Sequence, residues 1–433
     1  VSDGFDIVIG NPPYIQLQND GGKLAKLYAD CNYKTFARTG DIYCLFYERG
    51  HQLLKPNGHL CYITSNKWMR AGYGEKTRDF FAKNTNPMLL IDFAGVKIFE
   101  SATVDTNILL FAKAPNEHKT WCAVTNKQNK DSVKNLSVFV QQSGSECEFS
   151  NSDSWVILSP IEQSIKRKIE TVGTPLKDWD INIYRGVLTG YNEAFIISTE
   201  KRDEILANCQ TEDERTRTAE LIRPILRGRD IKRYGYNWDG LYLIATFPSR
   251  HYDIEKYPAV KKYLLGFGIE RLEQTGKSHI VNGEKIKARK KTNNKWFETQ
   301  DSISYWEDFF KPKIVWGNLN LEGAYSYAPD GMFINAPSPF IATSNTAILH
   351  ILNSKIADYY IRSLGVTRNG GYFEYKPMFV EKLPIPKCGL ERLCKYPIQP
   401  NTEQEHEIEH IIHSIYGLSM QETEYIENNA VLV

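Results

Sequence analysis

The stretch "FDIVIGNPPYIQ", Phe5 to Gln16, joins a short apolar run to two consecutive prolines. The β-branched run Asp6–Ile9 predicts a short buried strand. Pro12 and Pro13 fix their own φ angles and restrict the residue before each of them, so the strand has to end there. We therefore expect a rigid, extended loop at the C-terminal end of a strand, which is where open α/β sheets bind their ligands.

The composition limits what kind of protein this is. A chain of 433 residues with 42% hydrophobic content can bury a large core and is long enough for two or three domains. The formal net charge of +1 gives no overall polycation, so any nucleic-acid surface has to be local. The eight cysteines show no C-x-x-C or zinc spacing, which suits a reducing cytoplasm. Without a signal peptide or an apolar run of about 18 residues, we expect no membrane span.

The first part of the chain alternates between strand and helix patterns. The predicted elements after Phe5–Ile9 are a helix, a strand, a helix and two strands: Asp41–Lys55, His59–Asn66, Tyr73–Asn84, Met88–Phe93 and Thr106–Lys113. The last two strands are joined too briefly for a helical crossover and should pair antiparallel. We therefore predict an α/β fold, with a parallel sheet that carries an antiparallel hairpin at one edge.

The composition and the predicted secondary structure change further along the chain. Residues 116–153 are polar and weakly periodic, with at most a strand or two, such as Ser137–Gln142. From Trp155 onward aromatic residues are dense, which favours an α+β module. Its predicted strands are Ile181–Tyr184, Ala194–Ile197, Leu241–Thr246, Lys313–Trp316 and Gly331–Ala336, and its helices are Ile161–Val172, Ala219–Ile225, Tyr257–Leu265 and a segment over Glu403–Glu427. We expect domains over 1–122 and 155–387, a connection over 123–154 and a helical segment over 388–433.

Asn-Pro-Pro-aromatic after a strand resembles motif IV of the amino-group methyltransferases that use S-adenosylmethionine. The residue types suit that chemistry, because the adenine N6 lone pair is delocalised into the ring and two acceptors on its N–H groups can free it. Asn11 Oδ1 and the Pro12 carbonyl can serve as these acceptors in a loop stiffened by Pro13. Tyr14 offers a stacking face to a base flipped out of the duplex. A strand-ending turn with a capping Asn is the simpler alternative.

The next stretch strengthens the resemblance. "GDIYCLFYERGHQLLKPNGHLCYITSNKWMRAGYGEKTRDFF", Gly40 to Phe81, resembles the corresponding part of type IIG restriction–modification enzymes, which are gamma-class N6-adenine DNA methyltransferases often fused to an endonuclease. The resemblance places Asp41 and Tyr43 near the motif IV loop; a helix N-cap and a core aromatic are the alternatives. Three residues that end the following strand line the base pocket or its lid, or only form a turn: Asn66, Lys67 and Trp68.

"FAGVKIFESATVDTNILLF", Phe93 to Phe111, resembles the hairpin called motif VIII in the same family. The resemblance puts Phe99 beside the flipped adenine, opposite Tyr14. Packing in the core at a hairpin bend is the alternative for this ring.

Three later stretches resemble the TaqI-like C-terminal target-recognition domain: "IYRGVLTGYNEAFII" (Ile183–Ile197), "LIRPILRGRDIKRYGY" (Leu221–Tyr236) and "FEYKPMFVEKLPIP" (Phe373–Pro386). Arg and Lys near turns can reach phosphates or guanine edges. The run "KIKARKKTNNK", Lys285–Lys295, has six basic residues and no acid, although a solvated loop would look the same. The DNA-contact candidates are Arg185, Arg227, Arg229, Lys232, Arg233, Lys285, Lys287, Arg289, Lys290, Lys291 and, in a Gly-rich loop, Arg368.

The resemblance also indicates what the chain lacks. The family's Gly-rich cofactor loop lies upstream of motif IV, and no such turn precedes Asn11. With no initiator Met at Val1, we interpret the chain as a fragment whose S-adenosylmethionine site is incomplete and which does not methylate DNA alone. We expect double-stranded DNA and the missing N-terminal half as partners, possible association through an exposed sheet edge, and Mg only if the parent carries a nuclease.

His406, His410 and His413 share a helical face without a carboxylate-rich site, so we predict no metal site. A methyltransferase for RNA or a protein glutamine, and a non-catalytic DNA-specificity module, are the alternatives.

Overall fold

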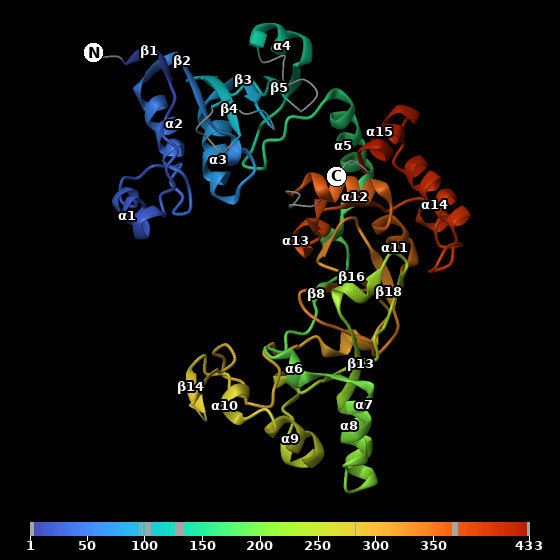
Figure 1. The fold of residues 1–433 in the computed structure, drawn as a ribbon. Helices are drawn as coiled ribbons and strands as arrows, with labels where there is room; N and C mark the ends of the chain where they lie inside the picture. Colours follow the sequence, from blue (N-terminus) through green and yellow to red (C-terminus); the bar gives the residue numbers. More distant parts are fainter. Residues whose placement is uncertain are drawn as a thin grey trace. The chain divides into compact units, whose positions relative to one another are not determined.

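The computed structural model describes residues 4–94, 96, 98–99, 105–125, 134–281, 283–365 and 371–430. The chain divides into two compact units, Val1–Ser164 and Ile165–Val433 (Figure 1). We call them the N-terminal and the C-terminal unit and describe each by itself.

A six-stranded sheet in the order β1-β2-β4-β3-β5-β6 forms the centre of the N-terminal unit. The strands are β1 (Phe5–Gly10), β2 (Leu54–Ser65), β3 (Asn86–Asp92), β4 (Thr106–Ala112), β5 (Thr120–Val124) and β6 (Ser145–Cys147). β1 runs parallel to β2 and β3 to β5, whereas β4 is antiparallel to both of its neighbours. The predicted α/β class, with parallel strands and an antiparallel hairpin, is confirmed.

The position of the hairpin differs from the prediction. β4 lies inside the sheet, with Leu60 paired to Phe111 on one side and Leu90 paired to Leu109 on the other. The hairpin cannot be an edge, because β5 and β6 add two more strands beyond β3. The segment Ser137–Gln142 is not a strand, because it lies in α4 (Leu136–Ser143), where Asn135 Oδ1 accepts the backbone N–H of Val138 and caps the helix.

Helices α2 (Ile42–Leu53) and α3 (Glu75–Asn84) pack on one face of this sheet, and α1 (Asn19–Tyr28) lies before them in the chain. Tyr47, Leu60, Phe81 and Phe111 are fully buried in the core between the helices and the strands. In β1 the side chains of Ile7 and Ile9 point away from this core, and they are 68% and 77% exposed. β1 is therefore an edge strand with an uncovered apolar face. The expected exposed sheet edge is present, but the prediction that Asp6–Ile9 is a buried strand is wrong, because no strand or helix covers this face in the described residues.

Two four-stranded sheets support the C-terminal unit, in the orders β19-β10-β13-β9 and β18-β16-β20-β8. Their strands are β8 (Ile183–Arg185), β9 (Ile196–Ser198), β10 (Ile222–Leu226), β13 (Leu241–Ile244), β16 (Lys313–Trp316), β18 (Tyr325–Ala328), β19 (Phe333–Ile334) and β20 (Pro339–Ala342). The helices include α5 (Pro160–Val172), α6 (Asn192–Phe195), α7 (Thr199–Ala207), α8 (Glu212–Leu221), α9 (Pro258–Leu265), α10 (Ile269–Leu272), α12 (Lys355–Ser363), α14 (Thr402–Ile415) and α15 (Met420–Ala430). The expected α+β mixture is present.

Two predicted elements of this unit are shifted. The helix expected over Ala219–Ile225 is instead α8, which begins after its N-cap Thr211 and is followed directly by β10. β-branched Ile222 and the proline at 224 favour the strand over a longer helix. Similarly, Ala194 lies in the short helix α6, and the expected strand begins only at Ile196.

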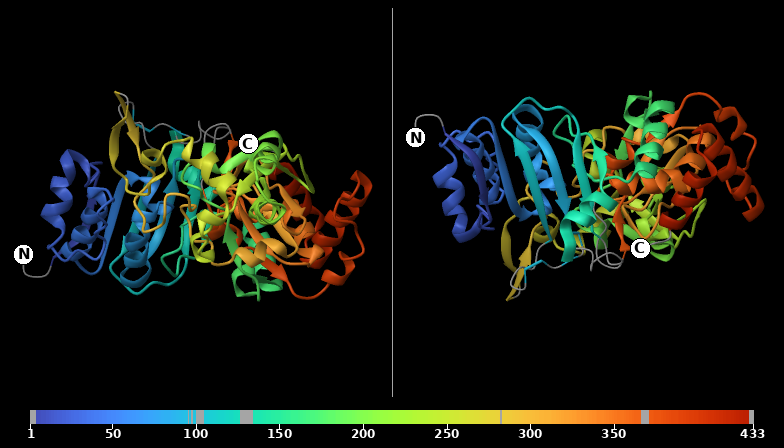
Figure 2. Two further views of the ribbon diagram at one scale, coloured as in Figure 1. Left: turned by 90° about the horizontal axis from the view of Figure 1, so that it is seen from below. Right: turned by 90° about the horizontal axis from the view of Figure 1, so that it is seen from above.

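A separate hairpin, β14 (Ser278–Val281) and β15 (Glu284–Lys287), lies beside α10 in the C-terminal unit. Figure 2 shows its two strands projecting as a narrow arm. The basic run predicted from the sequence begins on the second strand of this hairpin.

Candidate functional site

The Asn-Pro-Pro-Tyr loop follows β1 at the carboxyl edge of the N-terminal sheet. Pro12 is buried, whereas Asn11 is exposed and has no hydrogen-bond partner among the described residues. The Tyr14 ring is half-buried against the edge of Tyr43, with 6.0 Å between ring centroids and 82° between planes, and its hydroxyl donates to the Ile63 carbonyl at 3.5 Å. The loop is thus anchored by a proline and a tyrosine while the Asn11 amide stays open.

A clasp of three hydrogen bonds joins this loop to the start of α2. The Ile15 N–H donates to Asp41 Oδ1 at 2.8 Å, and the Ile42 N–H donates to the Ile15 carbonyl at 2.9 Å. The Leu17 N–H donates to the Gly40 carbonyl at 2.9 Å. The structure therefore brings Asp41, with Tyr43 two residues later, to the loop where the sequence placed them.

Two further strands end at the same edge, because β1, β2 and β3 point the same way. Asn66 follows β2, and its Nδ2 donates to Oδ1 of Asp92, the last residue of β3, at 2.7 Å. Lys67 is exposed beside them. The carboxyl edge thus gathers an open amide at Asn11, a half-buried carboxylate at Asp41 and a buried carboxylate at Asp92.

Burial shifts the pKa values of these groups upward. Burial raises the pKa of Asp41, against the hydrogen bond from Ile15 and the positive charge of Lys67. Burial also raises the pKa of Asp92, against its hydrogen bond from Asn66. The pKa of Tyr14 is raised by burial and further by the charge of Asp41, so this ring remains a neutral phenol at physiological pH.

The prediction that Trp68 lines the base pocket is wrong. Trp68 is fully buried and packs on Phe81, with 5.0 Å between ring centroids. Its Nε1 donates to Asn107 Oδ1 at 3.1 Å, and the same oxygen accepts from Thr64 Oγ1 at 3.0 Å. The ring is thus satisfied inside the core and cannot line a base pocket. Phe99 is half-buried and, within the described residues, makes no ring contact with Tyr14, so its predicted role remains a prediction.

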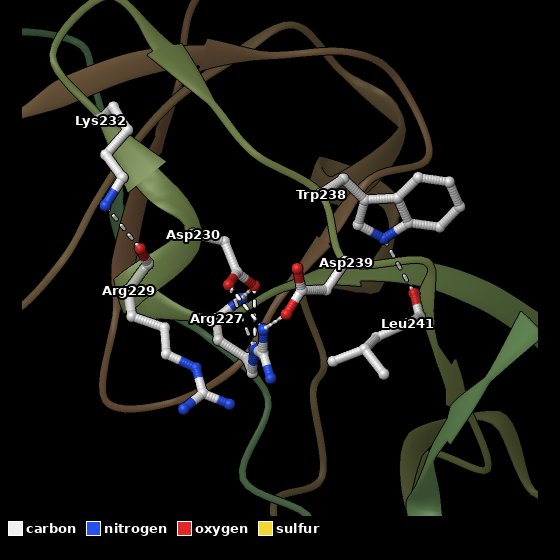
Figure 3. A network of polar contacts seen from close by, with 7 residues as sticks. All are labelled: Arg227, Arg229, Asp230, Lys232, Trp238, Asp239 and Leu241. Atoms are coloured by element: carbon white, nitrogen blue, oxygen red, sulfur yellow. Dashed lines mark hydrogen bonds and ion pairs between the residues drawn. The ribbon is translucent and has the colours of Figure 1, made fainter.

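The basic cluster after β10 is partly neutralised by carboxylates (Figure 3). Arg227 forms ion pairs with Asp230, at 2.7 Å, and with Asp239. The hydrogen bond to Asp230 raises the pKa of Arg227. Lys232 Nζ donates to the Arg229 carbonyl at 3.0 Å, whereas the Arg229 guanidinium is exposed and forms no hydrogen bond or ion pair with the described part of the chain. Arg229 and Lys232 are therefore the accessible cations of this cluster.

Two other predicted contacts fall in different surroundings. Arg233 forms an ion pair with Glu405 of α14 and donates to the Asn353 carbonyl at 3.1 Å, which ties β11 (Ile231–Lys232) to the C-terminal helices. Arg185 ends β8 and is exposed. Arg368 lies outside the described residues.

Arg289 corrects the interpretation of the basic run. It is only 4% exposed, and burial lowers its pKa to about 10. Its guanidinium donates to four backbone carbonyls at 2.6 to 2.9 Å, those of Thr189, Leu272, Trp296 and Glu298. Because these bonds use its donors inside the protein, Arg289 cannot contact phosphate as predicted.

The lysines of the same run are oriented differently. Four of them are exposed and form no ion pair with a carboxylate in the described ranges: Lys285, Lys287, Lys290 and Lys291. The run therefore combines one internal anchor with an outward basic surface.

Comparison with known protein families gives a match for one segment in each unit of the chain. Residues 1–99 match the Eco57I restriction-modification methylase family, and residues 223–385 match the TaqI-like C-terminal specificity domain. These two matches show a restriction–modification methylase segment and a TaqI-like specificity segment within this chain. The segment 1–99 contains the Asn-Pro-Pro-Tyr loop. The segment 223–385 contains the Arg227 cluster and the β14–β15 hairpin.

Full-length relatives agree with this assignment. The type II methyltransferase M.BstVI of Geobacillus stearothermophilus is 25% identical over 462 aligned positions, covering 98% of this chain and 75% of the relative. The type II restriction enzyme and methyltransferase RM.Eco57I of Escherichia coli is 24% identical, covering 83% of this chain and 37% of the relative. The type IIL restriction-modification enzyme MmeI, solved in complex with DNA, is 10% identical with a TM-score of 0.50, a likeness of fold. The structural match covers 98% of this chain but only 56% of that enzyme.

The similarity to methyltransferases implies the use of S-adenosylmethionine, and the match to the TaqI-like specificity domain supports DNA binding. The described edge residues can face a substrate, but the open strand β1 leaves one side of the edge without protein. Within the described residues, no group of three potential ligands could hold a metal, and no helix is long and apolar enough to cross a membrane.

Two edge residues escaped the sequence analysis. Asp92 looked like part of an apolar strand, and only its place as the last residue of β3 marks it. Tyr73 looked like the start of a helix, but its hydroxyl hydrogen bonds with that of Tyr43 at 2.7 Å. A polar residue directly after or at the end of each parallel strand is the signal that could have found Asp92.

Proposed function

We propose that this chain is the substrate-facing part of an adenine-N6 DNA methyltransferase that acts at one specific sequence. The exposed Asn11 amide at the carboxyl edge, in a loop clasped to Asp41, is the observation that carries the proposal. A target adenine leaves the duplex and enters beside this loop. Asn11 Oδ1 and the Pro12 carbonyl accept its two N6 hydrogens, which makes the nitrogen lone pair available.

The aromatic residues around the loop suit the flipped base. Tyr14 is held edge-on by Tyr43 and kept neutral by burial, so it can present a ring face without a charge. We place Phe99 on the opposite side of the base, and Asn66 and Lys67 at its rim. Base–aromatic stacking of this kind contributes about 1–3 kcal/mol per base.

We propose that the functions are divided along the chain. We assign residues 1–122 to the methyltransferase part, 123–154 to a connection, 155–387 to target recognition and 388–433 to a helical segment. The whole protein binds S-adenosylmethionine, which supplies the methyl group, with residues beyond this chain, and it needs Mg²⁺ only if it also carries a nuclease. The uncovered β1, with Ile7 and Ile9 exposed, supports our proposal that this chain alone binds DNA without methylating it and that β1 pairs with a further segment of the parent protein.

The test compares Asn11→Ala with wild type in the full-length parent protein. Loss of one preorganised acceptor should slow methylation by about 10²–10³, by analogy with the loss of an oxyanion-hole donor. Asn208→Ala is the matched control, since Asn208 is an exposed asparagine with an ordinary backbone conformation that follows α7, away from the loop in the sequence. Methylation by Asn11→Ala at the wild-type rate would refute the assignment of the loop.

A separate measurement identifies which base of the DNA is methylated. Mass spectrometry of the methylated duplex distinguishes N6-methyladenine from N4-methylcytosine, and the second product would overturn adenine specificity. Methylation of RNA or of a glutamine peptide in preference to DNA would favour the alternative substrates of this motif.

A further inference from the structure

The β14–β15 hairpin is a short arm with a fixed root. At the root, the Gly276 N–H donates to the Arg289 carbonyl at 2.8 Å and the Ala288 N–H donates to the Lys277 carbonyl at 2.9 Å. Arg271 Nη1 donates to the Lys287 carbonyl at 2.8 Å. Together with the four bonds of the Arg289 guanidinium, these contacts hold the base of the arm on its unit while the strands project (Figure 2).

The two faces of the arm differ in chemistry. Ile280 pairs directly with Lys285, and Ser278 pairs with Lys287, so these side chains share one face. All four residues are exposed. On the other face the pair His279 and Ile286 is half-buried against the unit. The arm therefore rests on one face and presents the other to a partner.

The outward face combines an apolar side chain with unpaired cations. Ile280 is 81% exposed, which makes it one of the most exposed large apolar residues described. Lys285 and Lys287 form no ion pair in the described part of the chain. A hydrophobic protein surface would leave these two ammonium groups buried without partners, whereas DNA offers phosphates on both sides of a groove and apolar thymine methyls at its floor.

The geometry selects one groove. Two paired strands lie about 4.8 Å apart before their side chains are added. The major groove, about 12 Å wide, admits a two-stranded ribbon, whereas the minor groove, about 6 Å wide, does not. The thymine C5-methyl is the apolar feature of the major groove, and an isoleucine has no donor or acceptor with which to read any other base edge.

We propose that the β14–β15 arm enters the major groove of the recognised DNA, where Ile280 contacts a thymine methyl and Lys285 and Lys287 contact the flanking phosphates. The inference rests on the proposed function, since it takes specific double-stranded DNA as the ligand. It adds a specificity-determining residue that carries no charge and was not among the sequence-derived candidates.

The experiment uses the full chain and a 30-bp duplex (about three helical turns), selected by the wild-type chain from a random-sequence library. Each thymine of this duplex is replaced in turn by uracil, which removes only the methyl group. For wild type we expect one replacement to weaken binding about fourfold, the effect of one buried methyl group. Ile280→Ala should weaken binding to the unmodified duplex about tenfold and should no longer respond to that replacement. Lys285→Ala and Lys287→Ala should each lower the slope of log affinity against log salt by about 0.9.

Met420→Ala on α15 is the matched control, because Met420 is 89% exposed but lies outside the arm. It should bind like wild type and keep the response to uracil. If Ile280→Ala kept the uracil response, or if it weakened selected and random duplexes equally, the base contact would be refuted. A changed oligomeric state of Ile280→Ala with unchanged DNA affinity would assign the face to a protein partner and overturn the proposal. If the wild-type chain selected no sequence at all, the proposed function itself would fail, which is a different result from an Ile280 variant that behaves like wild type.

Discussion

Arg289→Met tests whether the most buried cation of the basic run is an anchor or a DNA contact. Methionine keeps an unbranched apolar stem but removes the whole guanidinium. Four backbone carbonyls would lose a donor, those of Thr189, Leu272, Trp296 and Glu298. These carbonyls come from separate segments, so the loss would loosen the root of the β14–β15 arm as well as the loop that follows it.

The expected cost follows from the burial and the number of bonds. Each hydrogen bond from a charged donor contributes about 1.5–3 kcal/mol, and a buried acceptor left without a donor costs about 1–3 kcal/mol. The bonds are not additive, because water can reach some carbonyls once the side chain is shortened. We expect a loss of about 3–5 kcal/mol, similar to breaking a buried ion pair. Against a typical total of about 5–15 kcal/mol, such a loss leaves this unit close to unfolding.

Urea unfolding measures the loss, and hydrogen exchange locates it. Backbone amides in and around the arm root should lose protection in Arg289→Met, including those of Gly276 and Ala288. Lys290→Met is the control, since Lys290 is adjacent and exposed; its stability should stay within about 0.5 kcal/mol of wild type while its DNA affinity falls. If Arg289→Met kept wild-type stability but bound DNA more weakly, the anchor role would be refuted and the phosphate contact restored.

Three further variants address the N-terminal unit. Tyr14→Phe should flip a fluorescent base analogue almost like wild type because the ring face is kept, whereas Tyr14→Ala should capture it about 1–3 kcal/mol less well; equal fluorescence would contradict stacking. Asp41→Asn keeps an acceptor for the Ile15 N–H, so hydrogen exchange at Ile15 should stay slow, whereas Asp41→Ala should make it fast; no difference between the two would refute the clasp. Ile9→Lys should raise the monomer fraction in sedimentation without loss of stability, because Ile9 is 77% exposed on an edge strand, and unchanged association would show that β1 is not the contact.

Local patterns in the sequence predicted most of the N-terminal sheet. The run Phe5–Ile9, the helix after Asp41 and the antiparallel pairing of β3 with β4 all follow from periodicity and short connections. The place of β4 inside the sheet did not, because strand order is set by which strands find partners far away in the chain. Ser137–Gln142 failed for a different reason: alternating valines suggested a strand, but the N-cap at Asn135 and the contact of α4 with β5 decided for a helix.

Charged side chains were the hardest to place. The sequence showed six basic residues in Lys285–Lys295 but could not show that Arg289 alone turns inward, because its four acceptors lie up to 100 residues away. Arg227 and Arg233 likewise looked like free cations, and their carboxylate partners Asp239 and Glu405 became evident only in the fold. A basic run predicts a charged surface on average, whereas burial of one member depends on carbonyls that no local pattern reveals.

The two prolines support the proposal that the motif loop takes an amino group as its ligand. Pro12 and Pro13 carry carbonyls but no backbone N–H, so this part of the loop can accept hydrogen bonds and cannot donate them. The Ile15 N–H, which follows, is already used by Asp41, and Asn11 has no partner among the described residues. A keto oxygen placed here would meet mainly acceptors and lose its hydrogen bonds to water, at a cost of about 1–3 kcal/mol for a buried group. An amino group with two N–H donors would be satisfied, which supports adenine N6 over thymine O4 as the atom that the loop holds.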